Sequence, residues 1–138
     1  MLFFAKDIDE VQSHIRATPA VRAVGGGTKT NLSRDATISL REMSGIVDYR
    51  SDEYIISALA GTPLAVVESL LAEKGQSLPF DPLFVKRGAT LGGTVASGLS
   101  GPGRWRYGGL RDFILSVQLV SGAGRIIRGG ANVVKNAA

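Results

Sequence analysis

The sequence predicts an α+β fold in which short strands and two or three helices form one domain. Its 138 residues are enough for a single domain with its own core. Segments with apolar residues at helical spacing alternate irregularly with short segments rich in β-branched residues. The 18 glycines occur in clusters, which is typical of tight loops and not of a flexible low-complexity tract.

The first half of the chain is predicted to contain one helix and several short strands. Residues 7–17 carry apolar side chains at helical spacing and acids in the first turn, so they are expected to form a helix. Residues 20–24 and 37–40 are β-prone and are expected to be short strands. Residues 45–50 and 53–60 are expected to pair as two strands around a turn.

A second helix is predicted from the sequence around Thr62. Thr62 is expected to be its capping residue, and Pro63 is expected to be its first helical residue. Gly75 lies where a left-handed residue commonly ends a helix. The helix is expected to bury a stripe of four apolar side chains: Leu64, Val67, Leu70 and Leu71.

The remaining sequence predicts a loop and a hairpin. Residues 77–84 contain two prolines and are expected to be an extended loop. Residues 113–121 alternate apolar and other side chains and are expected to form a strand. The glycine-rich turn at 121–124 is expected to return this strand into residues 125–128 as a hairpin.

Composition excludes several classes of site. The chain has no cysteine, so disulfides, thiolate metal sites and thiol catalysis are excluded. His14 is the single histidine, which excludes a histidine-cluster metal site, and no metal ligand is assigned. No apolar run approaches the ~20 residues of a membrane span, and we see no signal peptide. A cytoplasmic protein is therefore expected.

Charge is distributed unevenly along the chain. Up to Asp81 the net charge is −3, whereas from Pro82 onward eight basic residues face Asp112 alone, giving +7. A basic half suits an anionic ligand or an acidic partner chain. Nucleic acid is the rival interpretation, but aromatic residues are only 7% of the chain and do not alternate with the basic ones.

The first candidate site follows an apolar strand and consists of Gly25, Gly26, Gly27, Thr28 and Lys29, with Asn31 close behind. Glycine lets backbone N–H groups approach a ligand, and successive N–H groups can converge on an anion. The pattern matches neither the Walker motif nor the Rossmann fingerprint. An unusual phosphate loop and a turn without a ligand therefore both stay open.

The second candidate site is residues 89–101, where small side chains fill nearly every position. Close packing of a helix on a sheet needs one small face, whereas a flat ring lying against backbone needs small residues all round. Thr90 is expected to cap a short helix from Leu91 and to aim its N-terminus at a pyrophosphate. The candidate cofactor-binding residues here are Ala89, Thr90, Leu91, Gly92, Gly93, Ala96, Ser97, Gly98, Ser100 and Gly101.

The third candidate site is residues 103–112, which hold three arginines. A single arginine is more often solvated surface than a ligand contact. Because this segment directly follows the small-residue stretch, Arg104, Tyr107 and Gly108 are candidate neighbours of the same ligand. Asp112 is expected to pair with an arginine or to cap a turn, and not to act as a catalytic base.

In this order and spacing the segments resemble FAD-binding domains of the PCMH type, the vanillyl-alcohol oxidase family. Within that family the resemblance is greatest to the FAD-binding subunits of glycolate oxidases. It covers nearly the whole chain. It is carried by the segments VRAVGGGTKTNLSR, AGTPLAVVESLLAEKGQSLPFDP, ATLGGTVASGLSGPGRWRYGGLRDFILSVQLVSGAGRIIRGG and VVKNAA.

The resemblance implies how residues 1–138 would hold FAD, between two small α+β subdomains. Residues 25–29 would bind the pyrophosphate through backbone amides, and residues 89–101 would line the flavin and its ribityl chain. Many relatives attach FAD through a histidine beside the first loop. Here Thr28 and Lys29 occupy that place, so non-covalent FAD is expected. Relatives continue past the VVKNAA segment, so this domain is expected to be incomplete at its C-terminus and inactive alone.

The resemblance also implies an activity and partners. The chain would be the FAD-binding portion of an oxidoreductase that acts on a 2-hydroxy acid such as glycolate. A second flavin subunit and an iron–sulfur subunit would be its partners. Alternatives are a non-catalytic or partner-dependent FAD-binding module and an enzyme of the UDP-N-acetylenolpyruvoylglucosamine reductase type. The catalytic residues stay unknown.

Overall fold

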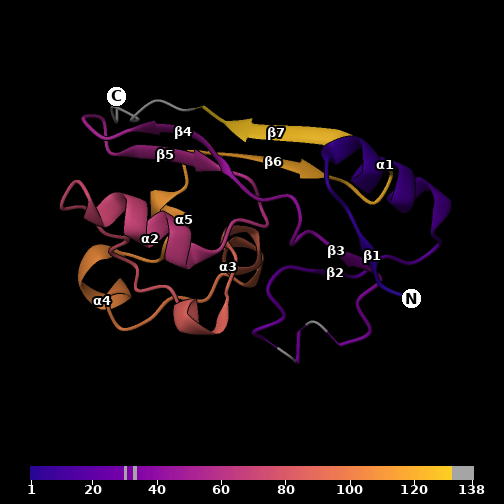
Figure 1. The fold of residues 1–138 in the computed structure, drawn as a ribbon, viewed down its shortest axis with the longest axis horizontal. Helices are drawn as coiled ribbons and strands as arrows, with labels where there is room; N and C mark the ends of the chain where they lie inside the picture. The colour runs from indigo at the N-terminus through magenta and orange to yellow at the C-terminus, as the bar shows by residue number, and fades with distance from the viewer. Residues whose placement is uncertain (30, 33, 132–138) are drawn as a thin grey trace.

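A computed structural model describes residues 1–29, 31–32 and 34–131, and it has the predicted α+β architecture (Figure 1). Thr30 and Ser33 of the first motif lie outside the described residues. So does the VVKNAA segment, within residues 132–138. In the described part of the chain, no helix is long and apolar enough to cross a membrane.

A small parallel sheet and one helix form one end of the molecule (Figure 1). The sheet has the order β1-β3-β2 and consists of β1 (Phe3–Phe4), β2 (Ala23–Val24) and β3 (Ile38–Ser39). Helix α1 (Ile8–Ala17) begins after Asp7, whose carboxylate accepts the amide N–H of Glu10 at 2.9 Å. The predicted helix and both predicted strands are therefore confirmed. Their shared core consists of Ala5, Val11 and Ile38, with Val120 packed against it.

An antiparallel strand pair and a second helix form the middle of the chain. Strands β4 (Ile46–Arg50) and β5 (Ile55–Ala58) pair as predicted. Helix α2 (Leu64–Ala72) buries Leu64, Val67 and Leu71, whereas Leu70 is only half-buried. Gly75 has φ +66°, which confirms the predicted left-handed end of the helix.

The prediction that Thr62 caps α2 is wrong. The residue before the helix is Pro63, and no side chain caps it. The Thr62 hydroxyl accepts the Gly45 amide N–H at 2.9 Å and donates to the Gly45 carbonyl at 3.1 Å. The first amide of the helix, that of Leu64, donates to the Ala89 carbonyl at 2.8 Å. A contact distant in sequence therefore replaces the local cap.

Short helices follow the predicted loop at residues 77–84. They are the 3₁₀ helix η1 (Val85–Arg87), α3 (Leu91–Ser97), α4 (Arg104–Tyr107) and α5 (Leu110–Phe113). The sequence did not predict α4 and α5. Asp112 stabilises the start of α5, because its carboxylate accepts the amide N–H of Gly109 at 2.8 Å. The expected turn-capping role of Asp112 is thus confirmed.

The C-terminal hairpin consists of β6 (Ser116–Val120) and β7 (Ile126–Gly130), which pair antiparallel as predicted. The strand begins at residue 116 and not at 113, because α5 takes up the residues before it. Val117, Leu119 and Ile127 lie on one face of the hairpin and are 41%, 44% and 49% exposed. Val120, on the opposite face, packs against the core near α1. The hairpin thus presents an apolar face to solvent.

Val67 is the residue on which the packing of α2 can be tested. Val67→Ala is expected to lower the free energy of unfolding by about 1–3 kcal/mol, because it empties a site that is 1% exposed. The matched control is Val66→Ala on the same helix, where the side chain is 48% exposed and the expected change is within about 0.5 kcal/mol. Urea denaturation measures both, and equal losses would contradict the assigned burial.

Candidate functional site

The first glycine loop lies directly against the turn that precedes α3. A Cβ atom added to Gly26 would collide with the carbonyl oxygen of Gly88, and one added to Gly25 would collide with the hydroxyl of Thr90. Both positions therefore require glycine for close approach of backbone. The structure thus brings the first and second candidate segments together.

The loop offers a row of backbone N–H groups that make no hydrogen bond to the described residues. Within the described part of the chain, the amides of Gly25, Gly26, Gly27 and Thr28 donate no hydrogen bond to another protein group. The Gly26 carbonyl, in contrast, accepts a hydrogen bond from the Arg41 guanidinium at 3.1 Å. Successive unpaired amides in a turn form a binding site for an anion.

The main chain is also accessible at two glycines beside the contact between Gly26 and Gly88. Gly27 and Gly88 have φ +67° and +90°, a conformation that favours glycine. Among the described residues, apart from the immediate chain neighbours, no atom lies within 4 Å of the position that a Cβ would take at Gly27 or Gly88. A ligand can therefore reach the main chain at these two points without meeting a side chain.

Two cations lie at one aromatic ring beside the loop. The Lys29 ammonium is 5.8 Å from the centre of the Phe84 ring, and the Arg87 guanidinium carbon is 5.1 Å from it. Both distances are within the range of cation–π attraction. Burial lowers the pKa of Lys29 below its ordinary value, because the ammonium loses part of its hydration.

The N-terminus of α3 is already engaged by protein groups. Thr90 caps this helix as predicted, accepting the amide N–H of Gly93 at 3.3 Å. The amides of Leu91 and Gly92 donate to the Thr62 and Ala60 carbonyls at 2.9 and 2.8 Å. These amides of α3 therefore have protein partners, and the orientation of this helix N-terminus toward a pyrophosphate stays a prediction.

The small residues of the second segment divide into two groups. A Cβ at Gly92 would come within 2.7 Å of the Ala60 side chain, and one at Gly101 within 2.7 Å of Asp81. At these two positions the requirement for glycine comes from packing. Gly98, in contrast, has φ +63° and open space around it. Ala96, two residues before it, is exposed.

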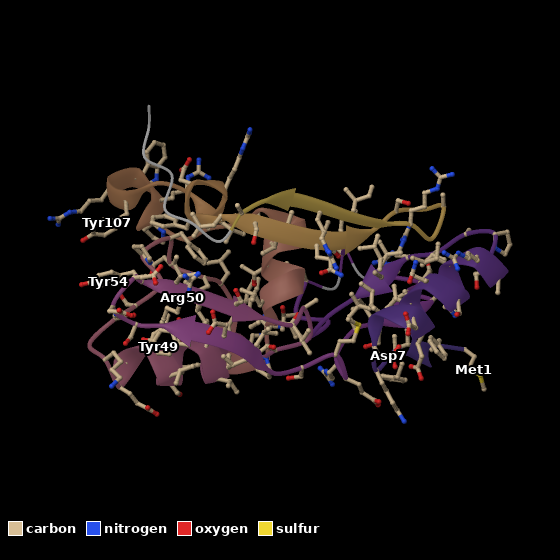
Figure 2. The ribbon with its side chains drawn as sticks, turned by 90° about the horizontal axis from the view of Figure 1, so that it is seen from above. Met1, Asp7, Tyr49, Arg50, Tyr54 and Tyr107 are labelled. Atoms are coloured by element: carbon tan, nitrogen blue, oxygen red, sulfur yellow. The ribbon has the colours of Figure 1, made fainter. Side chains whose placement is uncertain are left out.

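Within the described residues, the third segment, residues 103–112, is hydrogen-bonded to Asp81 and Ser100 and not to the glycine loop. The Gly103 amide donates to the Asp81 carboxylate at 3.2 Å, and the Leu110 amide to the Ser100 hydroxyl at 3.1 Å. Arg104 and Tyr107 are exposed, and Figure 2 shows Tyr107 at the end of the molecule opposite Met1. Gly103 and Tyr107 line a hollow of about 460 Å³ together with Gln76, Ser77, Asp81 and Glu68.

Three further residues at the site were not found from the sequence. The sequence analysis assigns no role to Arg41, whose guanidinium binds a carbonyl of the glycine loop. Phe84 lies outside the stretch of small residues, and no motif in the sequence marks it as a site residue. Arg87 was counted only as part of the basic half. Within the described residues, no group of three or more His, Asp or Glu side chains could hold a metal ion.

Comparison with known proteins places the chain among flavoproteins. The family model described as FAD binding domain matches residues 1–130. Glycolate oxidase subunit GlcE of Escherichia coli (strain K12) is 38% identical over 134 residues, which are 95% of this chain and 38% of that protein. D-2-hydroxyglutarate dehydrogenase of Xanthomonas citri pv. viticola is 30% identical, over 94% of this chain and 29% of that protein. The chain thus spans well under half the length of these relatives.

Solved structures show the same fold at lower identity. A glucose oxidase, the Phl p 4 I153V variant, superposes with a TM-score of 0.77 at 18% identity, covering 93% of this chain and 28% of that one. Alkyldihydroxyacetonephosphate synthase superposes with a TM-score of 0.74 at 24% identity, covering 95% and 29%. The family match over residues 1–130 and the identity to the glycolate oxidase subunit confirm the predicted resemblance: this chain belongs to the FAD-binding domains of the PCMH type, and its cofactor is FAD.

Proposed function

We propose that this chain binds FAD non-covalently in an oxidoreductase that acts on a small 2-hydroxy acid. The observation that carries the proposal is the row of four amides from Gly25 to Thr28, which have no partner among the described residues and lie against the turn at Gly88. The diphosphate of FAD is an anion that can accept such N–H groups. The site therefore fits the part of FAD that distinguishes it from a simple flavin.

The substrate class comes from the relatives. Their names specify glycolate, D-2-hydroxyglutarate and D-lactate, and each of these acids carries a hydroxyl group on the carbon next to a carboxylate. FAD supplies the two-electron oxidation of such a hydroxyl when it is bound. The chain's own contribution in this proposal is to bind and orient the cofactor.

The proposed roles of the three segments follow the resemblance to the family. Residues 25–29 bind the diphosphate, and Asn31 lies just beyond them. Residues 89–93 and 96–101 line the ribityl chain and the flavin, with Gly98 as an open point. Arg104, Tyr107 and Gly108 border the flavin from the third segment. Thr28 and Lys29 leave no histidine at the loop for covalent attachment, which supports non-covalent binding.

Partner subunits and location belong to the same proposal. The relative from Escherichia coli is named as a subunit, which supports assembly with other oxidoreductase chains, a second flavin subunit and an iron–sulfur subunit among them. A cytoplasmic location stays part of the proposal.

A partner-dependent FAD-binding module is the second candidate function. The apolar face of the hairpin, formed by Val117, Leu119 and Ile127, favours it. Apolar surface of this kind commonly marks a place where another chain or segment packs. In this case the chain would hold FAD stably only when that face is covered.

Flavin binding is the direct test of the proposal. The purified chain, mixed with FAD and desalted, is expected to keep a visible flavin absorbance. Acid precipitation should then release all of the flavin into the supernatant, because no covalent bond holds it. A folded protein that stays colourless would contradict FAD binding, and flavin that stays in the precipitate would contradict non-covalent attachment.

Gly26→Ala is expected to reduce FAD retention at least tenfold, because the added Cβ would push the loop away from the Gly88 carbonyl. Gly122→Ala is the matched control, since no atom lies within 4 Å of its Cβ position in the hairpin turn. Fluorescence titration measures both. Because Gly26→Ala could also disturb folding, Arg41→Ala provides a milder variant that removes only the bond to the Gly26 carbonyl. Unchanged FAD affinity in both variants would remove the loop from the site.

Leu119→Lys tests the second candidate. A lysine on the apolar face of the hairpin is expected to reduce self-association of the isolated chain, which light scattering measures. Gln118→Lys is the matched control, because Gln118 lies on the opposite face of the same strand and is also exposed. Equal scattering from both variants would argue against a docking role for this face.

A further inference from the structure

Helix α4 presents aromatic and basic side chains to solvent, on the side of the molecule away from α1 (Figure 1). Trp105 is 86% exposed and Tyr107 is 55% exposed, although large aromatic side chains bury most of their area in a typical protein. Arg104 and Arg106 are exposed as well. Together these four side chains form the α4 patch. The proposed FAD site gives no role to Trp105 or Arg106.

Each arginine of the α4 patch lies over the aromatic ring that follows it in sequence. The Arg104 guanidinium carbon is 5.3 Å from the centre of the Trp105 ring, and that of Arg106 is 5.3 Å from the centre of the Tyr107 ring. Stacking restricts a guanidinium without using its N–H groups, which can still bind a carboxylate in the plane of the group. The patch thus holds two arginines that are positioned before any ligand binds.

No acidic side chain neutralises these two arginines within the described part of the chain. Neither Arg104 nor Arg106 forms an ion pair or a side-chain hydrogen bond there. The carboxylates of Asp81 and Asp112 lie at the two ends of α4, but they accept backbone amides of the flanking glycines, at 3.2 and 2.8 Å. The positive charge of the α4 patch is therefore available to an external anion.

The backbone beneath the α4 patch is closely packed. The Gly101 amide donates to the Asp81 carbonyl at 2.7 Å, and the Tyr107 amide to the Gly103 carbonyl at 3.0 Å. A Cβ at Gly101 would come within 2.7 Å of Asp81, and one at Gly103 within 2.6 Å of the Pro79 carbonyl oxygen. A surface that is preformed in this way loses little entropy when a partner docks on it.

We propose that the α4 patch is a docking surface for an acidic segment of a partner protein, whose carboxylates bind the two arginines and whose apolar side chain covers Trp105. Tryptophan, tyrosine and arginine are the residues that most often dominate binding energy at protein interfaces. The charge of +7 from Pro82 onward matches an acidic partner. A nucleic acid fits less well, because base stacking needs an open ring face and an arginine lies over each ring.

Trp105 is the single tryptophan of the chain, so its fluorescence reports on the α4 patch directly. The probe is a short synthetic peptide of glutamates around one leucine, and the control peptide has glutamines in place of the glutamates. The acidic peptide is expected to shift the Trp105 emission to shorter wavelength, because the indole leaves water when it is covered. The glutamine peptide should cause no shift.

Arg106→Gln is expected to weaken binding of the acidic peptide about tenfold, as measured by fluorescence anisotropy of a dye-labelled peptide. Arg128→Gln is the matched control, because it removes the same charge from an exposed arginine of β7 and should leave the affinity unchanged. Trp105→Leu should also weaken binding, whereas Trp105→Tyr should retain most of it, since tyrosine keeps an aromatic ring. All four variants should retain FAD like the unaltered chain.

The inference is overturned if the chain does not distinguish the two peptides, if the Trp105 emission stays constant on binding, or if Arg106→Gln and Arg128→Gln have equal effects. Displacement of the peptide by FAD would also overturn it, because the peptide would then occupy the cofactor site. Single-stranded DNA of equal charge that binds more tightly, and loses affinity in Arg106→Gln, would assign the patch to nucleic acid instead. A chain that binds the acidic peptide but no flavin would contradict only the proposed function.

Discussion

Gly26 lies so close to the carbonyl oxygen of Gly88 that no side-chain atom fits between the two backbone segments. This contact joins the end of β2 to the turn before α3. The second segment is in turn fastened to the start of α2, because the Leu64 amide donates to the Ala89 carbonyl and the Leu91 amide to the Thr62 carbonyl. The position of the open amides therefore depends on a chain of backbone hydrogen bonds that ends at this one contact. Side chains contribute little to it, which explains why the site is rich in glycine.

Strained backbone borders the same contact. Asp81 and Phe84 both have positive φ, at +56° and +62°, and such conformations cost on the order of 1 kcal/mol or more for residues with side chains. Hydrogen bonds offset the strain, since Asp81 accepts the amides of Gly101 and Gly103 while the Phe84 carbonyl closes the turn at 85–89. These two residues bend the loop from α2 so that it reaches both the first and the third candidate segments. The strain is thus part of what holds this loop against Gly103 at one end and beside Lys29 at the other.

Local patterns in the sequence predicted what local forces determine. Helix α1 and the hairpin β6–β7 follow from apolar spacing and turn residues, and the glycine loop follows from composition. Contacts distant in sequence determine the features that were not predicted. Helix α5 depends on the Leu110 amide meeting the Ser100 hydroxyl. The first two amides of α3 likewise donate to carbonyls distant in sequence, at residues 60 and 62. No periodicity or motif reveals such partners.

The two differently charged parts of the chain contribute different groups to the candidate site. The first 81 residues carry a net charge of −3, yet they supply the amide loop, whereas the remainder carries +7 and supplies Arg87. Backbone amides have only partial charges, so they act over short range and fix the orientation of an anion. Full charges act over about 8 Å at physiological salt and raise the local concentration of an anionic ligand before contact. In the proposed FAD site, the loop before Asp81 would contribute the amides that orient an anion, and the positive charge from Pro82 onward would favour an anionic ligand.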